Sequence, residues 1–98
     1  MNTIRMDFLL MEETIQSFEK SAESLDNTVY ELRTIINVLA GGALLGETGE
    51  ALIKTLQSNL IPAVQKVQNK LTETATDMKV AVTDMRESDA STNQGFAS

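Results

Sequence analysis

Apolar residues recur at alternating intervals of three and four positions along the first part of the chain. Spacing of this kind is the a/d pattern of a helix that packs along one side of a partner. The first seam consists of Phe8, Met11, Ile15, Phe18, Ala22, Leu25, Val29, Leu32, Ile36 and Leu39. Asp7 precedes the seam as a candidate N-cap, so we expect a first helix over about residues 8–40.

A second apolar seam with the same spacing lies in the other half of the chain. Its members are Leu52 or Ile53, then Leu56, Leu60, Val64, Val67, Leu71, Ala75, Met78, Val82 and Met85. We expect a second helix over about residues 47–87. Pro62 lies inside it, and proline lacks a backbone N–H and crowds the preceding turn. We therefore expect a kink there, with no shift in the phase of the seam.

Glycine is concentrated between the two seams, since four of the five glycines fall within residues 41–49. Glycine is a poor helix former, so we expect a turn over residues 41–46. Two long helices joined by a short turn run antiparallel. The sequence therefore predicts a single all-α domain, an antiparallel two-helix hairpin. A flexible polar tail is expected over residues 88–98, with Phe96 as its apolar exception.

The apolar surface is wider than one seam per helix, because the seams are flanked by Leu9, Leu10, Ile35, Val38, Ile61 and Ala63. A strip of small hydroxyl residues runs beside the first seam and ends in apolar residues on both sides: Leu10, Thr14, Ser17, Ser21, Ser24, Thr28, Ile35 and Val38. A lone hairpin would leave such a surface in water, whereas pairing two hairpins into a four-helix bundle dimer would cover it. The alternatives are a solvated boundary strip and a monomer that tolerates scattered apolar residues.

Charge and chemistry narrow the possible functions. The net charge of −6 argues against nucleic acid, because neutralising phosphates requires clustered Lys and Arg. Histidine and cysteine are absent, which removes most nucleophile–base pairs and most transition-metal sites. We therefore expect no catalytic residues, no cofactor and no metal. No apolar run reaches the length of a membrane span, and the N-terminus lacks the pattern of a signal peptide.

The turn resembles that of the WXG-motif family, the small helical hairpins of bacterial type VII (ESX) secretion related to the early secreted antigenic target. Members carry Trp-x-Gly in the turn. Here Leu44 stands at the tryptophan position, Gly46 at the glycine, and Ala51 and Leu52 at the small-then-apolar pair that follows. The resemblance implies that Leu44 and Gly46 belong to a turn surface that meets the secretion apparatus. The residues alone leave open that Leu44 instead caps the end of the hairpin core.

The end of the second helix is similar to the family as well. Members carry a Tyr-x-x-x-Asp/Glu export signal there, often followed by an apolar residue. Here Met85 replaces the aromatic residue, Asp89 supplies the carboxylate and Phe96 follows, while Val80 with Asp84 is a second register. By this resemblance Met85 and Asp89 would face the secretion apparatus. The protein would be secreted without a signal peptide, from a cytoplasmic pool.

The resemblance implies a non-catalytic type VII secretion substrate, or a targeting or chaperone partner, that acts through helix–helix binding. It would form a homodimer or a heterodimer with a related hairpin. A larger secreted toxin and the secretion ATPase are further candidate partners. Two other interpretations fit the same pattern: a cytosolic coiled-coil adaptor or scaffold, and a needle- or filament-type hairpin subunit of another secretion system.

Overall fold

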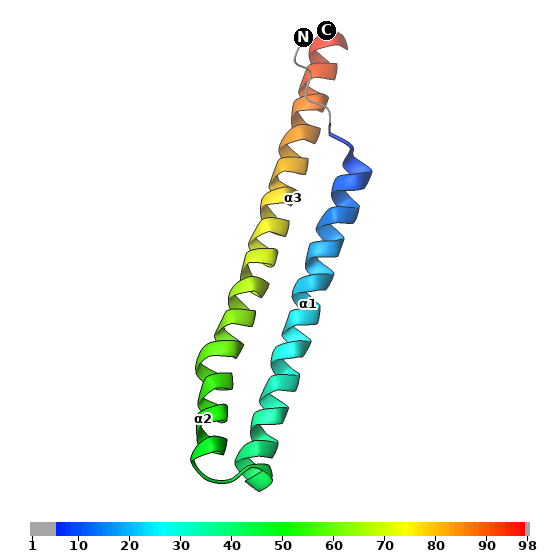
Figure 1. Ribbon diagram of the computed structural model, residues 1–98. Coiled ribbons are helices and arrows are strands. Elements are labelled where there is room, and N and C mark those ends of the chain that lie inside the picture. The colour runs from blue at the N-terminus through cyan, green and yellow to red at the C-terminus, as the bar shows by residue number, and fades with distance from the viewer. Residues whose placement is uncertain (1–5, 98) are drawn as a thin grey trace.

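The molecule is a rod made of two long antiparallel helical arms (Figure 1). The computed structural model describes the backbone of residues 6–97 and the side chains of residues 6–88. Helix α1 spans Phe8–Val38, and the chain returns through α2, Glu47–Thr55, and α3, Ile61–Ala97. The extents of 77 × 19 × 18 Å are those of two helices side by side, each about 10 Å in diameter. The predicted all-α hairpin is confirmed.

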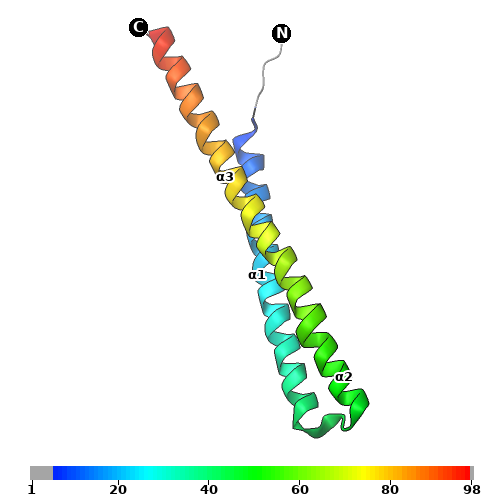
Figure 2. The ribbon, with the colours of Figure 1, turned by 90° about the vertical axis from the view of Figure 1, so that its left-hand side faces the viewer.

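The two arms cross at a shallow angle (Figure 2), as expected when seams of period near 3.5 pack together. The core divides into two clusters. Near the chain termini Ile15 packs with Ala75 and Val82, and near the turn Val29 and Ile36 pack with Ile61. Every residue of the first seam is buried or half-buried: Phe8, Met11, Ile15, Phe18, Ala22, Leu25, Val29, Leu32, Ile36 and Leu39.

Both ends of α1 follow from local chemistry. The Asp7 carboxylate accepts a hydrogen bond of 3.0 Å from the Leu10 backbone N–H, which confirms the predicted N-cap. At the other end α1 passes into a π-helical segment, η1, over Leu39–Ala43. Gly42 within it and Gly46 after it have φ of +114° and +90°, a region that only glycine adopts without strain. The change of chain direction therefore begins at Gly42 and ends at Gly46, within the predicted turn over residues 41–46.

The second arm remains helical through Pro62, but its hydrogen bonds change before the proline. A π-helical segment, η2, spans Leu56–Leu60, and the Ile61 N–H donates to the Leu56 carbonyl. A bond to the fifth residue back adds one residue to the turn. Pro62 explains this π-helical segment, because the proline ring crowds the preceding turn and the proline nitrogen cannot donate a hydrogen bond.

The extra residue shifts the seam of the second arm, so the expectation of an unchanged phase is wrong. Ile61 is 6% exposed, whereas Leu60 and Val67 are 41% and 54% exposed. Leu52 is also exposed, and Ile53 takes the seam position instead. The remaining predicted seam residues of this arm are buried or half-buried: Leu56, Val64, Leu71, Ala75, Met78, Val82 and Met85.

The second arm extends beyond its predicted end at about residue 87, into the segment expected as a tail over residues 88–98. The backbone of α3 continues in helical conformation to Ala97. The segment contains no proline and one glycine, Gly95, so nothing in it forces the hydrogen-bond ladder to stop. The last turns of α3 project beyond the first turn of α1 (Figure 2).

Candidate interaction surfaces

One long side of the hairpin is bridged by polar side chains, and we call it the polar flank. It consists of Glu12, Glu19, Asp26, Gln68, Lys79 and Arg86. Lys79 Nζ lies 3.2 Å from a Glu19 carboxylate oxygen, and Gln68 donates to Asp26 over 3.3 Å. Arg86 pairs with Glu12 and covers the Phe8 ring, with its Cζ 4.8 Å from the ring centroid.

These polar contacts are half-exposed, so each contributes little to stability, about 1 kcal/mol or less. Their structural effect is to link α1 and α3 along the polar flank and to set the alignment of the arms. The exposed fractions of the paired side chains lie between 48% and 56%. This flank is therefore already engaged within the hairpin and offers little apolar area to another protein.

The opposite side carries small and apolar side chains, and we call it the apolar flank. Its residues in α1 are Leu10, Thr14, Ser17, Ser21, Ser24, Thr28, Ile35 and Val38, and those of the second arm are Leu60, Val67, Thr74 and Ala81. Most of them directly precede a buried seam residue, as Thr74 precedes Ala75. The polar-flank residues mostly follow one, as Lys79 follows Met78. Successive residues are separated by about 100° around a helix, so the two sets lie on opposite sides of the seam.

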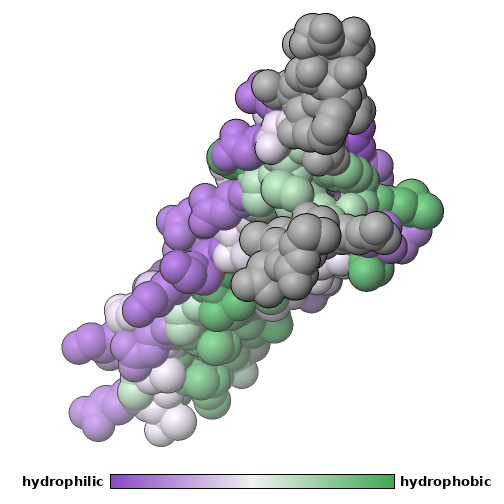
Figure 3. Space-filling view, turned by 90° about the horizontal axis from the view of Figure 1, so that it is seen from above, coloured by the Kyte–Doolittle hydropathy of each residue, from purple (hydrophilic) through white to green (hydrophobic). Residues whose placement is uncertain are grey.

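Apolar side chains on this flank are open to solvent. Leu10, Val38 and Val67 are 58%, 58% and 54% exposed. Seen along the rod, polar residues gather on one side and apolar residues on the other (Figure 3). The sequence pattern identified the α1 half of this surface. It missed the contribution of Leu60 and Val67, because without the π-helical segment both residues fall in the seam.

The turn presents a second apolar surface. Leu44 is 38% exposed, and its backbone carbonyl faces Gly49, the buried glycine of α2. Its neighbour Leu45 is 78% exposed, and Leu52 is 40% exposed. Leu44 therefore partly covers the start of α2 while the turn as a whole stays open. Leu45 belongs to no heptad position, so the spacing argument did not single it out.

The other predicted turn residues, Gly46 and Ala51, lie at the start of α2. Gly46 is the N-cap of α2, and its carbonyl accepts a 3.1 Å bond from the Glu50 N–H. Ala51 lies in the first turns of α2 and is exposed. The turn between α1 and α2 forms the rounded end of the rod (Figure 1).

The predicted export signal is divided between the seam and the projecting end of α3. The Met85 side chain is half-buried, so only part of it is accessible to another protein. Asp89 and Phe96 lie on α3, but their side chains are outside the described residues. The part of the predicted signal that extends beyond the core is therefore the segment from residue 89 onward.

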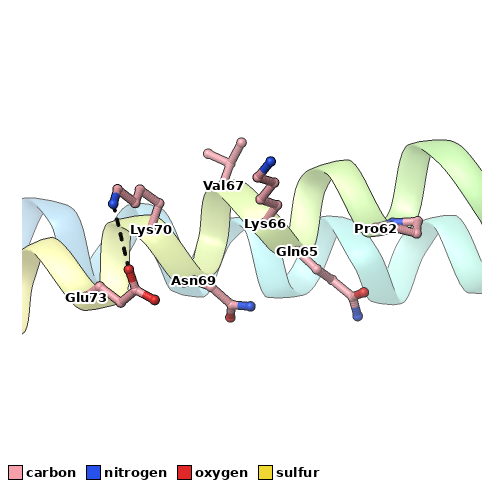
Figure 4. Close-up of a pocket in the computed structure, with 7 residues that line it drawn as sticks. All are labelled: Pro62, Gln65, Lys66, Val67, Asn69, Lys70 and Glu73. Atoms are coloured by element: carbon pink, nitrogen blue, oxygen red, sulfur yellow. Dashed lines mark ion pairs between the residues drawn. The ribbon is translucent and has the colours of Figure 1, made fainter.

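A hollow of about 820 Å³ lies against the outer face of α3 and is lined by that helix alone, from Pro62 to Glu73. Its side chains point away from α1, with Lys70 paired to Glu73 at 3.9 Å (Figure 4). The hollow is an open strip of surface. Residues 6–88 contain no group of three or more side chains placed to hold a metal ion. None of the described helices contains an apolar stretch that would span a bilayer.

The fold and these surfaces define a small helical hairpin that presents helix faces and an apolar tip. The chain belongs to the WXG100 family, the proteins of 100 residues with WXG, whose model matches residues 3–90. No curated protein and no solved structure matches the chain. Family members are known as small type VII secretion substrates rather than enzymes, and they typically pair as hairpin dimers. This chain has no tryptophan, and the sequence interpretation assigns Leu44 to the tryptophan position.

Proposed function

We propose that this protein is a type VII secretion substrate or a targeting partner of one, and that it acts by binding another helical hairpin. The observation that carries the proposal is the difference between the two long sides of the hairpin. The polar flank is bridged between the arms, while the apolar flank exposes Leu10, Ile35, Val38 and Val67. Removing each such side chain from water contributes roughly 1.5–3 kcal/mol when burial is complete, which favours assembly.

The export role of the proposal rests on the projecting end of α3. Its backbone extends past the first turn of α1 as a single helix (Figure 2). A helix that extends beyond its partner helix suits recognition by a groove in another protein. The core clusters end at Val82, so this segment is available for recognition without unfolding the hairpin.

Truncation after Ser88 is expected to abolish secretion while leaving the hairpin folded. The deletion removes Asp89 and Phe96 but keeps the half-buried Met85 and also Arg86, which pairs with Glu12 of α1. The readouts are the amount of protein in the culture supernatant of the native host and the thermal midpoint by circular dichroism. Secretion at the level of the full chain would contradict the export role.

A pair of single substitutions sharpens the same test. Asp89→Ala should reduce secretion, whereas Glu73→Ala should not, because Glu73 lies on the outer face of α3 far from its end. Secretion of both variants at the level of the unaltered chain would show that Asp89 is not part of a signal. Equal loss would indicate a general effect of removing a carboxylate from α3.

A further inference from the structure

Methionine side chains gather at the open end of the hairpin, the end away from the turn, where α1 begins and α3 projects (Figure 2). No methionine occurs between residues 12 and 77. Four of the five methionines belong to the described residues, and all four are half-buried: Met6, Met11, Met78 and Met85. We infer that these thioethers form an oxidation-sensitive site, at which a peroxide separates α3 from α1 while the turn half of the hairpin stays closed.

The two halves of the core differ in composition because of this distribution. At the open end Met6, Met11 and Met78 pack against the buried core residues. Near the turn the described core consists of valine, isoleucine and leucine side chains. Dilute peroxide oxidises a thioether, whereas an aliphatic side chain does not react with it. Only the open end of the core can therefore change chemically under such conditions.

Half-burial makes the methionines both reachable and structurally important. The susceptibility of a side chain to oxidation follows its exposure, and each of these four keeps part of its surface in water within the folded hairpin. Both arms contribute to the site. Met11 and Met85 directly precede Glu12 and Arg86, which pair across the arms, so oxidation adds polar oxygens on both sides of one interface.

The reaction transfers one oxygen atom from hydrogen peroxide to each sulfur. The O–O bond of the peroxide breaks and an S–O bond forms. The sulfur is oxidised, since it gives an electron pair to the new bond, and the peroxide is reduced to water. The product, methionine sulfoxide, is polar where the thioether was apolar. Keeping its oxygen in a core without a hydrogen-bond donor is costly, so the oxidised side chains favour contact with water.

The open end has few other contacts that would hold the arms together after oxidation. Arg86 pairs with Glu12 and covers the Phe8 ring, and Lys79 pairs with Glu19. These contacts are half-exposed, and contacts of that kind contribute little to stability. Chain ends also open more readily than a core does, whereas the turn joins the arms covalently at the other end. Separation should therefore start at the open end and stop before the aliphatic core.

Amide hydrogen exchange of the full chain, before and after treatment with dilute hydrogen peroxide, tests the inference. Peptide mapping by mass spectrometry should find one added oxygen on each of the four methionines. Amides of residues 8–18 and 75–85 should then exchange about tenfold faster or more, the effect of one unpaired polar group in a core. Amides of residues 29–36 and 53–64 should keep their rates. The two methionine sulfoxide reductases should restore the original rates.

Leucine variants supply the matched control, because leucine and methionine exchange in a core with little change of volume. The fourfold variant Met6→Leu, Met11→Leu, Met78→Leu and Met85→Leu should show the same exchange with and without peroxide. Adding Leu32→Met to that variant places one half-buried thioether in the turn half. Peroxide should then accelerate exchange around residue 32 and leave the open end unchanged.

Full oxidation of the unaltered chain without faster exchange at residues 8–18 would overturn the inference, since the methionines would then only fill space. Equal acceleration in both halves, or an equal response of the fourfold leucine variant, would overturn it as well. So would failure of dilute peroxide to oxidise the four methionines in the folded chain. These measurements use the purified protein, so their outcome is independent of the proposed role in secretion.

Discussion

Replacing Gly49 with alanine is expected to destabilise the hairpin by about 3 kcal/mol, the cost of severe overpacking. Gly49 is buried where the Leu44 backbone carbonyl lies against α2, and a Cβ built on it overlaps that carbonyl oxygen. Backbone cannot rotate away as a flexible side chain can, so the turn or the start of α2 must move. Thermal denaturation followed by circular dichroism should show a midpoint lowered by more than roughly 10 °C.

Gly41→Ala is the matched control for that measurement. A Cβ at Gly41 meets no other atom within 4 Å, and its φ is not positive. Alanine there should leave the midpoint unchanged or raise it, by up to about 1 kcal/mol of stability, because alanine favours helix more than glycine does. Equal midpoints for the two variants would mean that the turn does not approach α2 as described.

Replacing Ile61 with alanine is expected to cost about 2–5 kcal/mol, the range for buried aliphatic side chains. Leu60→Ala should cost less than about 1 kcal/mol, because the Leu60 side chain is 41% exposed and Ile61 is 6% exposed. The two residues are adjacent, have equal numbers of carbon atoms and undergo the same truncation. Their difference therefore measures whether the seam passes through Leu60 or through Ile61 just before Pro62.

Urea unfolding at a protein concentration below that of self-association gives the required free energies. Low concentration matters because Leu60 lies on the apolar flank, where a second copy would bury it. A larger loss for Leu60→Ala than for Ile61→Ala would show that the seam continues in unchanged phase through Pro62, without the π-helical segment Leu56–Leu60.

The turn shows how this chain differs from the motif that names its family. The sequence interpretation assigns Leu44 to the tryptophan position, and the Leu44 Cγ lies 3.4 Å from the place of a Cβ on Gly49. The contact is local, between the turn and the first turn of α2. A smaller apolar side chain at position 44 is therefore compatible with the same hairpin, while Leu45 and Leu52 maintain an apolar tip.

Heptad spacing was sufficient to predict the hairpin because each arm needs only one buried stripe. In α1 the apolar residues from Phe8 to Leu39 follow a regular period, and helical geometry alone places them on one face. Asp7 as N-cap and the glycine-rich connection are likewise local features of the chain. The family resemblance of the turn and of the chain end could be identified for the same reason.

Only the tertiary structure decided three further features. The π-helical turn before Pro62 moves the seam from Leu60 to Ile61, a choice between two adjacent aliphatic residues that periodicity cannot make. The division into polar and apolar flanks depends on which side of the seam is bridged, and that requires Glu19 and Lys79 to be aligned across the hairpin. The burial of Gly49 depends on the path of the turn. Local sequence determines which stripe is apolar, but contacts between residues far apart in the chain determine which neighbours that stripe receives.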